Sequence, residues 1–334
     1  MTESIAGPLG PPLTRMLGAP ATVSTCRLIP GGASKESWWV DAQAGGRTHA
    51  LIVRRNSPSS SVGGEVLSLE NEHRLLALVH EHGATVPRPW GFIPDLSGRP
   101  AYVMDRVDGV SIGRKVVRDE ELEQARARLP QQMAESLAAI HAVPSDELDF
   151  LPAGDPGEAP ARHSVSRMER ELDCLGEPHP VIELGLAWLH RHCPEPRPRT
   201  LVHGDFRVGN LMVDRNGLAA VLDWELAHRG DPAEDLGWPL IRAWRFGRDD
   251  LRLGGIGPVE PFLERYNELT GREIGPADLD YWELLGNVNW AVIQLIQRER
   301  HLSGREPSVE LAVLGRLSAE TEREILAMLE RLGD

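Results

Sequence analysis

Lysine, cysteine and long hydrophobic runs are all scarce in this chain of 334 residues. Only two lysines, Lys35 and Lys115, stand beside 34 arginines, so a function that needs a lysine has two candidates. The three cysteines, Cys26, Cys174 and Cys193, are widely spaced and form no CxxC pair, which excludes a disulfide scaffold and a zinc ribbon. No run of 18 apolar residues occurs, so we expect no transmembrane helix.

Positive charge is also in deficit, because 36 basic residues face 50 acidic ones and the formal net charge is -14. A general nucleic-acid binder needs a basic face that displaces counterions, and a polybasic membrane anchor needs clustered cations, so both classes are excluded. Few cysteines, and a first stretch without a basic region followed by an apolar one, predict a cytoplasmic protein without a signal peptide. A hydrophobic content of 41% indicates a globular chain.

The first third of the chain has the pattern of a small sheet. Residues 1–20 are rich in proline and glycine, and we expect a loose lead-in there. Three short strands are predicted between about 22 and 55, with turns at Gly31-Gly32 and Gly45-Gly46. Apolar spacing predicts a helix over 65–83, the prolines of VPRPWGFIP break the chain, and RPAYVMDRV (99–107) is typical of another strand.

Long helical patterns dominate the rest of the chain. We expect helices over about 119–142, 161–175, 180–193, 258–270, 276–301 and 306–332. Pro130 should kink or divide the first of them, and one strand-rich island lies at 200–224. The predicted fold is therefore α+β, with a small antiparallel-sheet lobe (21–107) and a larger helical lobe (108–334).

The strand-rich island carries the most informative motif, LVHGDFRVGNLMVDRNGLAAVLDWELAHRGDPAEDLGW (201–238). DRNG is a strong hairpin turn, and the two flanking strands bring Asp205, Asn210 and Asp223 to one end of the hairpin. An aspartate, an asparagine five residues later and a second aspartate beyond a hairpin have the layout of a phosphoryl-transfer site. The first aspartate accepts the proton of the attacking hydroxyl, and the other two side chains offer hard oxygen ligands to Mg²⁺.

HGDFRVGN, VLDWE and GDPAEDLGW resemble the catalytic loop, the metal-binding segment and the following stretch of aminoglycoside phosphotransferases and related small-molecule kinases. LIVRRNSP and HLSGREPSVELAVLGR are most similar to a bacterial subgroup related to the kinase-like domains fused to some acyl-CoA dehydrogenases. The resemblance covers roughly residues 20–330. It implies a protein-kinase-like bilobal fold and an ATP-dependent, Mg²⁺-dependent phosphotransferase (kinase) that acts on a hydroxyl of a small molecule.

Carried over position by position, the resemblance implies roles for five residues around the loop. Asp205 is the catalytic base or the carboxylate that orients the hydroxyl. Asn210 and Asp223 are the Mg²⁺ ligands. His203 braces the loop by hydrogen bonds, and Asp235 holds the loop backbone from the following helix.

The same resemblance implies a nucleotide site in the small lobe. Glu72 lies on the helix where the family places the acidic partner of its nucleotide-binding cation. Gly31, Gly32 and Ser34 occupy the first hairpin, which covers the phosphates, because glycine lets the backbone approach them closely. The segment that begins at Met104 contacts the base mostly through backbone groups, so ATP and GTP are both possible.

The sequence departs from the family at the phosphate-binding cation. The family supplies a lysine from the third strand, where this chain has ALIVRR. Strand alternation lets only one of Arg54 and Arg55 face the cleft, and the register favours Arg54, paired with Glu72. Lys35 in the first hairpin is the one lysine near the expected phosphates, and Arg207 adds positive charge near the transferred phosphoryl group.

The identity of the acceptor stays open at this point. Trp238, Asn287 and Trp290 are possible substrate contacts in the helical lobe, although most of its tryptophans are expected in the core. Together with the subgroup resemblance, they favour a hydroxyacyl thioester or an aromatic or macrocyclic alcohol, such as a macrolide, over an aminoglycoside. A pocket lined by four or more acidic side chains would reverse that expectation.

A second hypothesis is a nucleotide-binding regulatory module of the same fold without catalytic activity. The missing strand lysine favours this module, and the intact Asp205, Asn210 and Asp223 set favours the kinase. A substrate panel that measures released ADP distinguishes the two. The oligomeric state cannot be inferred from the sequence.

Overall fold

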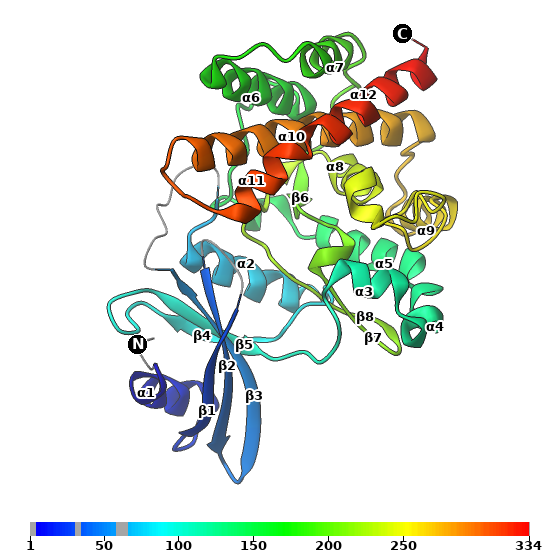
Figure 1. Cartoon of the computed structure of the whole chain (residues 1–334). Coiled ribbons are helices and arrows are strands. Elements are labelled where there is room, and N and C mark those ends of the chain that lie inside the picture. The colour runs from blue at the N-terminus through cyan, green and yellow to red at the C-terminus, as the bar shows by residue number, and fades with distance from the viewer. Residues whose placement is uncertain (1–4, 31–34, 58–65, 334) are drawn as a thin grey trace.

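The computed structural model describes residues 5–30, 35–57 and 66–333, which form a sheet-containing lobe and a larger helical lobe (Figure 1). The antiparallel sheet of the first lobe has the strand order β1-β2-β3-β5-β4. Its strands are β1 (Thr22–Ile29), β2 (Lys35–Ala44), β3 (Arg47–Asn56), β4 (Pro89–Ile93) and β5 (Ala101–Asp105). This architecture confirms the predicted α+β class.

The register of β2 and β3 decides which side chains face the helical lobe. Ser37 pairs with Arg54, and Val40 pairs with Leu51. Because successive side chains alternate between the two faces of a strand, Arg54 and its neighbour Arg55 point to opposite sides of the sheet. Leu51 is fully buried on the outer side, so Arg54 belongs to the inner face that looks toward the helical lobe.

The segment before the sheet is not the loose lead-in that its prolines and glycines suggest. Ala6–Leu17 forms helix α1, which ends at Gly18 in the left-handed conformation (φ 70°). Ile5, Leu9 and Leu13 recur every four residues, and all three are fully buried against the outer face of the sheet. The burial of this apolar stripe outweighs the helix-breaking tendency of the two prolines inside α1.

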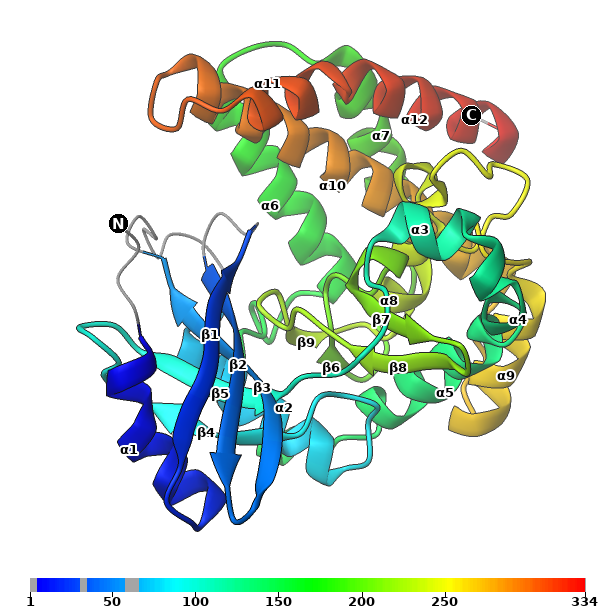
Figure 2. The ribbon, with the colours of Figure 1, turned by 60° about the horizontal axis from the view of Figure 1, so that its bottom comes forward.

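Helix α2 (Leu69–Glu81) packs against β4 and β5 of the sheet (Figure 2). Its N-cap is Ser68, whose hydroxyl accepts a hydrogen bond from the backbone N–H of Asn71 at 3.2 Å. Beside α2 lies β4, in the segment VPRPWGFIP where we expected the prolines to break the chain. Pro89 is tolerated because β4 is the edge strand of the sheet, where a missing N–H leaves no ladder bond unmade.

The helical lobe follows the predicted pattern with two differences. Pro130 lies in the first turn of α5, so the first predicted helix is divided, and the last is divided at Leu317. The helices are α3 (Gly113–Arg118), α4 (Glu123–Arg126), α5 (Leu129–His141), α6 (Pro160–Leu175), α7 (Pro180–Arg191), α8 (Ala233–Gly237), α9 (Glu260–Thr270), α10 (Pro276–Leu302), α11 (Val309–Arg316) and α12 (Ser318–Leu332). The short strands are β6 (Thr200–Val202), β7 (Leu211–Asp214), β8 (Gly217–Val221) and β9 (His228–Gly230).

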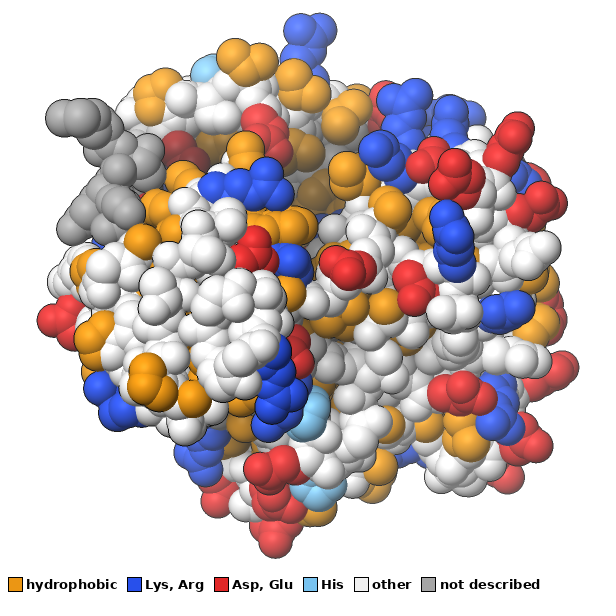
Figure 3. Space-filling view, turned by 90° about the horizontal axis from the view of Figure 1, so that it is seen from below, with side chains coloured by type: hydrophobic (Ala, Val, Ile, Leu, Met, Phe, Trp, Pro, Cys, Tyr) orange, Lys and Arg blue, Asp and Glu red, His pale blue; other side chains and the backbone are white. Residues whose placement is uncertain are grey.

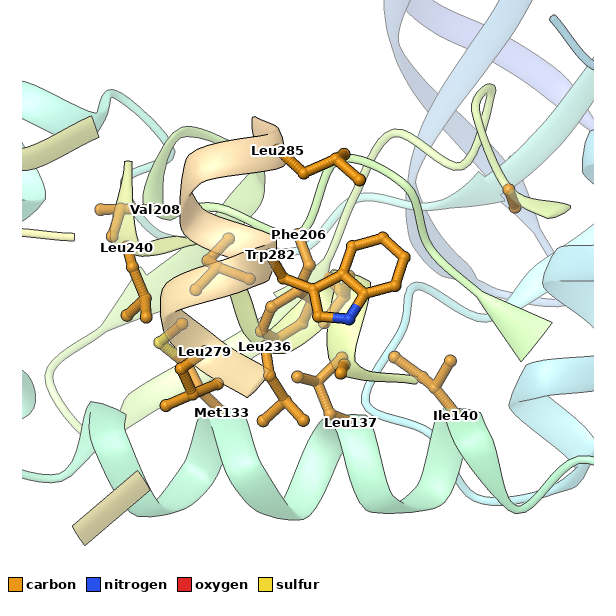
Figure 4. Close-up of a cluster of buried hydrophobic side chains, with 14 of the residues drawn as sticks. Met133, Leu137, Ile140, Phe206, Val208, Leu236, Leu240, Leu279, Trp282 and Leu285 are labelled. Carbon is orange, nitrogen blue, oxygen red and sulfur yellow. The ribbon is translucent and has the colours of Figure 1, made fainter. Parts of the chain in front are cut away.

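The centre of the helical lobe is a continuous apolar core in which α5 and α10 face the segment between β6 and β7 (Figure 4). Phe206 and Val208 of that segment are fully buried there, and Trp282 of α10 is 1% exposed. Alternation along the segment then leaves Asp205 and Arg207 at its surface. The core thus fixes the chain directly after the predicted catalytic aspartate.

Two surface properties bear on the predicted partners. Within the described ranges, no helix combines the length and the apolar character that crossing a bilayer requires. The face seen in Figure 3 mixes acidic and basic side chains without one large basic area.

Candidate active site

The loop that follows β6 is held by hydrogen bonds from a buried carboxylate of α8. Asp235 accepts the backbone N–H of His203 at 2.7 Å and that of Gly204 at 3.0 Å. Its Oδ2 also contacts His141 Nε2 of α5 at 3.1 Å. Burial alone would raise the pKa of Asp235, but the hydrogen bond and charge of His141 outweigh burial and lower it. A fully buried, ionised Asp235 therefore fixes the start of the loop.

His203 adds a second brace from its imidazole ring. Its Nε2 lies 3.0 Å from the carbonyl oxygen of Leu222, and its Nδ1 lies 3.1 Å from the backbone N of Asp205. The first contact needs a donor and the second an acceptor, so the ring is neutral with its proton on Nε2. His203 thus links the loop to the segment that carries Asp223.

The carboxylate of Asp205 receives three hydrogen bonds from three different side chains. Trp238 Nε1 donates to Oδ1 at 2.7 Å, Arg207 Nε donates to the same oxygen at 2.9 Å, and Asn210 Nδ2 donates to Oδ2 at 2.5 Å. Asp205 lies at the surface of the loop, with its side chain 16% exposed. The arrangement holds a carboxylate in one orientation beside the cleft, which is what a group that positions a hydroxyl needs.

Asn210 and Asp223 lie on either side of the β7–β8 hairpin, as predicted. The amide nitrogen of Asn210 donates to Asp205, so its amide oxygen is left as the donor atom for a ligand. Asp223 has φ +66° and contacts Arg54 Nη2 through Oδ1 at 3.1 Å. Burial would raise the pKa of Asp223, but the charge and hydrogen bond of Arg54 lower it.

These two side chains fit Mg²⁺. Mg²⁺ takes hard oxygen ligands, and proteins bind it with one or two carboxylates or amides while water and phosphate complete the shell. Asn210 and Asp223 offer such oxygens. Among the described residues there is no cluster of three His, Cys, Asp or Glu side chains with metal-binding geometry, so a site that holds a metal together with substrate phosphates fits better than a closed protein cage.

Two cations and a buried acid meet on the inner face of the sheet. Glu72 of α2 is 1% exposed, and its Oε2 pairs with Lys35 Nζ at the start of β2. Its Oε1 accepts the hydroxyl of Tyr102 at 2.7 Å, and Arg54 Nε lies 3.6 Å from the same oxygen. Burial and the charge of Glu72 raise the pKa of Tyr102 well above its ordinary value, so Tyr102 stays a hydrogen-bond donor.

The alternation argument for the two arginines agrees with the geometry. Arg54 faces the cleft, whereas Arg55 is 1% exposed on the outer side and donates to Glu36 from Nε at 3.0 Å and Nη2 at 2.8 Å. Arg54 forms the expected ion pair with Glu72, with its Nε 3.6 Å from Oε1. Its hydrogen bond goes to Asp223, however, and Glu72 is also bound by Lys35.

The other predicted nucleotide contacts give less information. Gly31, Gly32 and Ser34 lie outside the described residues. Met104 lies on β5 opposite Ile52, with 9% of its surface exposed. Met104 is thus on the strand that leads into the helical lobe, and its contact with a base stays a prediction.

Three tryptophans form a row beside Asp205. Ring centroids of Trp238 and Trp244 are 5.7 Å apart, and those of Trp244 and Trp290 are 4.8 Å apart. The guanidinium of Arg207 lies 4.4 Å from the ring centroid of Trp244, which orients it by a cation–π contact. Trp238 and Trp290 therefore lie near the predicted site, with Trp238 bound to the carboxylate itself.

The prediction that Asn287 contacts the substrate is wrong, because its side chain points into the interior. It is 1% exposed, and its amide nitrogen donates to the carbonyl oxygen of Glu283 at 2.9 Å and to Met328 Sδ at 3.4 Å. The helical spacing relative to Trp290 is real, but it turns Asn287 toward α12 and the interior.

Sequence reasoning missed three side chains of the site. Tyr102 and Glu225 contact Lys35 or its partner Glu72, and His141 supports Asp235. Alternation in RPAYVMDRV could have pointed Tyr102 inward with Met104. No sequence signal connects His141, which is 94 residues from its partner, to the loop.

A cavity of about 750 Å³ lies between α6, α10 and β9. Gly204, next to Asp205, lines it together with apolar side chains such as Leu226 and Ile293. Three glutamates and four arginines also line it: Glu171, Glu234 and Glu299, and Arg167, Arg170, Arg229 and Arg305. The cavity is therefore of a size for a small molecule and has an apolar body with a charged rim.

The fold and this loop define a kinase-like phosphotransferase class, and comparison with known proteins gives the family. Residues 25–282 match the model of the phosphotransferase enzyme family (APH), so the chain belongs to that family. Acyl-CoA dehydrogenase family member 10 of Mus musculus is 26% identical over 80% of this chain. The chain spans only 26% of the length of that relative.

Solved structures show the same fold. One from Ralstonia eutropha, assigned as an aminoglycoside phosphotransferase, has a TM-score of 0.76 at 21% identity and covers 97% of this chain and 98% of its own. A thermostable mutant of aminoglycoside phosphotransferase APH(4)-Ia, in a ternary complex with AMP-PNP and hygromycin B, has a TM-score of 0.58 at 18% identity and covers 94% and 97%. The chain thus has the fold of these small-molecule phosphotransferases.

Proposed function

We propose that this protein is a Mg²⁺-dependent kinase that transfers the terminal phosphoryl group of ATP or GTP to a hydroxyl of a small molecule. The observation that carries the proposal is the Asp205 carboxylate, which Trp238, Arg207 and Asn210 hold in one orientation. A relative of the same fold that binds AMP-PNP and hygromycin B supports a nucleotide and a small molecule as the two substrates.

In this mechanism Asp205 accepts a hydrogen bond from the acceptor hydroxyl and takes its proton as the new O–P bond forms. The bond between the terminal phosphorus and its bridging oxygen breaks, and the nucleoside diphosphate leaves with the electron pair. Arg207 neutralises charge near the transferred group. Mg²⁺ held by Asn210 and Asp223 would supply further neutralisation of the phosphate charge.

Removal of a metal ligand tests this assignment. Asp223→Ala should abolish Mg²⁺-dependent release of ADP and weaken calorimetric binding of ATP in Mg²⁺ buffer. The matched control is Asp146→Ala, because Asp146 is exposed and far from the loop in sequence. Unchanged turnover in the Asp223→Ala protein would contradict the proposal, and wild-type binding of ATP without any turnover would favour the regulatory module.

The charges of the cavity support an acceptor that is not a polycation. Each of its three glutamates already faces a cation: Glu171 pairs with Arg167 at 2.9 Å, Glu234 with His228 at 3.2 Å, and Glu299 with Arg305 at 3.4 Å. Of the two other arginines, Arg229 lies 3.6 Å from the exposed Asp149, and Arg170 has no ion pair among the described residues. An aminoglycoside would therefore meet paired carboxylates and excess positive charge.

This charge pattern predicts the outcome of an acceptor panel. Release of ADP should rise with a neutral or anionic alcohol that has a large apolar body, such as a macrolide or a hydroxyacyl thioester. Kanamycin and hygromycin B should give no more than background release. Turnover that is fastest with an aminoglycoside would show that the cavity does not select the acceptor by charge.

A further inference from the structure

On the inner face of the sheet, Lys35 and Arg54 make their shortest contacts with different carboxylates. Lys35 pairs with Glu72 and lies 3.0 Å from Glu225, whereas Arg54 forms its hydrogen bond with Asp223 at 3.1 Å. Arg54 approaches Glu72 only to 3.6 Å, and its buried Nε makes no hydrogen bond with any described residue. The close partner of Glu72 is therefore the lysine of β2 and not the arginine of β3.

We propose that Lys35, paired with Glu72, is the residue that binds the nucleotide phosphates, and that Arg54 instead holds Asp223. This inference rests on the proposed function, and it moves the phosphate-binding cation from the third strand to the second. Lys35 is the first residue of β2, and its Nζ lies 3.0 Å from Glu225, two residues beyond Asp223. It thus lies between the helix that orients it and the segment that holds the expected metal ligand.

The chemistry of the two cations fits this division. An ammonium group is a compact point charge with three donors, so Lys35 can keep Glu72 and still donate to a phosphate oxygen. It is 6% exposed, and a cation that is this buried needs fixed anionic partners. Of the two carboxylates beside it, Glu72 is buried, and Glu225 is 25% exposed and can exchange with an anionic ligand.

The scarcity of lysine makes the proposal testable on the unmodified chain. With lysine labelled at ¹³Cε, Lys35 and Lys115 are the only two sources of signal, and Lys115→Met assigns them. Addition of a non-hydrolysable ATP analogue with Mg²⁺ should shift the Lys35 signal, adenosine should shift it much less, and exposed Lys115 should not respond. A Lys35 signal that responds equally to adenosine and to the ATP analogue would overturn the proposal.

Calorimetry with variants gives an independent answer. Lys35→Met should weaken ATP binding about tenfold to a hundredfold, since a charge-assisted contact is lost, while adenosine binds as before and shows that the protein is folded. Lys115→Met should bind both ligands normally. If Lys35→Met binds ATP like the wild type and Arg54→Met does not, the arginine is the phosphate ligand and this inference fails alone. If the wild type binds neither ATP nor GTP, the proposed function fails with it.

Discussion

At the scale of single residues, the site is organised around side chains that hold other side chains. Asp205 owes its orientation to Trp238, Arg207 and Asn210 rather than to its own packing. Asp235 does the same for the loop backbone at His203 and Gly204. Substitution of a supporting residue should therefore lower kcat and leave the affinity for the substrates unchanged.

Trp238 offers the sharpest case. Trp238→Phe keeps an aromatic ring in the row of tryptophans and removes the N–H that donates to Asp205 together with part of the indole ring, a truncation that the control variant reproduces elsewhere. We expect kcat to fall about tenfold, because a hydrogen bond to a charged group is lost, while KM for ATP stays the same. Steady-state kinetics measures both, with Trp188→Phe in α7 as the control. A normal kcat would mean that Asp205 needs no help from Trp238.

A second prediction at this scale concerns His228 at the edge of the cavity. Burial alone would lower its pKa, but the charge and hydrogen bond of Glu234 raise it from 6.5 to about 9. The protonated form is thus favoured in the folded state, and this contribution to stability is complete below about pH 6.5 and lost as the pH rises through 9. Chemical denaturation between these pH values should show a falling free energy of unfolding. His228→Gln should flatten that slope, and an unchanged slope would contradict the assignment.

At the scale of elements, the sequence predicted best those helices in which the apolar residues repeat over a long stretch. The helices 161–175 and 276–301 match α6 and α10 closely, and the DRNG turn joins β7 to β8. The failures have physical reasons. Helix α1 and strand β4 contain prolines, and only burial on the sheet or an edge position makes them possible.

The burial of α1 predicts that this segment stabilises the small lobe. Leu13→Ala should lower the free energy of unfolding by about 3 kcal/mol, because it leaves a cavity against the sheet. Leu302→Ala is the matched control, since Leu302 is 69% exposed. Denaturant titration compares the two. If both variants lose equally little free energy of unfolding, α1 does not stabilise the lobe, and the segment behaves as the loose lead-in that the composition suggested.

The site was predictable to a different extent from the fold. Asp205, Asn210 and Asp223 are close in sequence and joined by one hairpin, so motif spacing alone brought them together. The partners of Glu72 come from separate strands, and only the three-dimensional pairing separates Lys35 from Arg54. Asn287 shows the limit of helical spacing, which gives relative positions on a helix but not the face that packs inward.

At the scale of the whole molecule, the sheet lobe brings the cations and the helical lobe brings the carboxylates of the loop. The ion pair between Arg54 and Asp223 joins residues that are 169 positions apart and connects the two lobes. Gly204, next to Asp205, lines the cavity between α6 and α10. In the proposed function, the cations of the sheet lobe bind the nucleotide and this cavity binds the acceptor.

Direct observation of phosphoryl transfer tests this central claim. The wild-type chain and Asp205→Asn are each incubated with Mg²⁺, terminally labelled ATP and the acceptor panel, and labelled product is measured by mass spectrometry against released ADP. The account predicts product and ADP in equal amounts from the wild type, and a rate about 10²- to 10⁴-fold lower from Asp205→Asn, since the base is lost. Nucleotide binding by the wild type with no labelled product from any acceptor, or equal rates from both proteins, would contradict it.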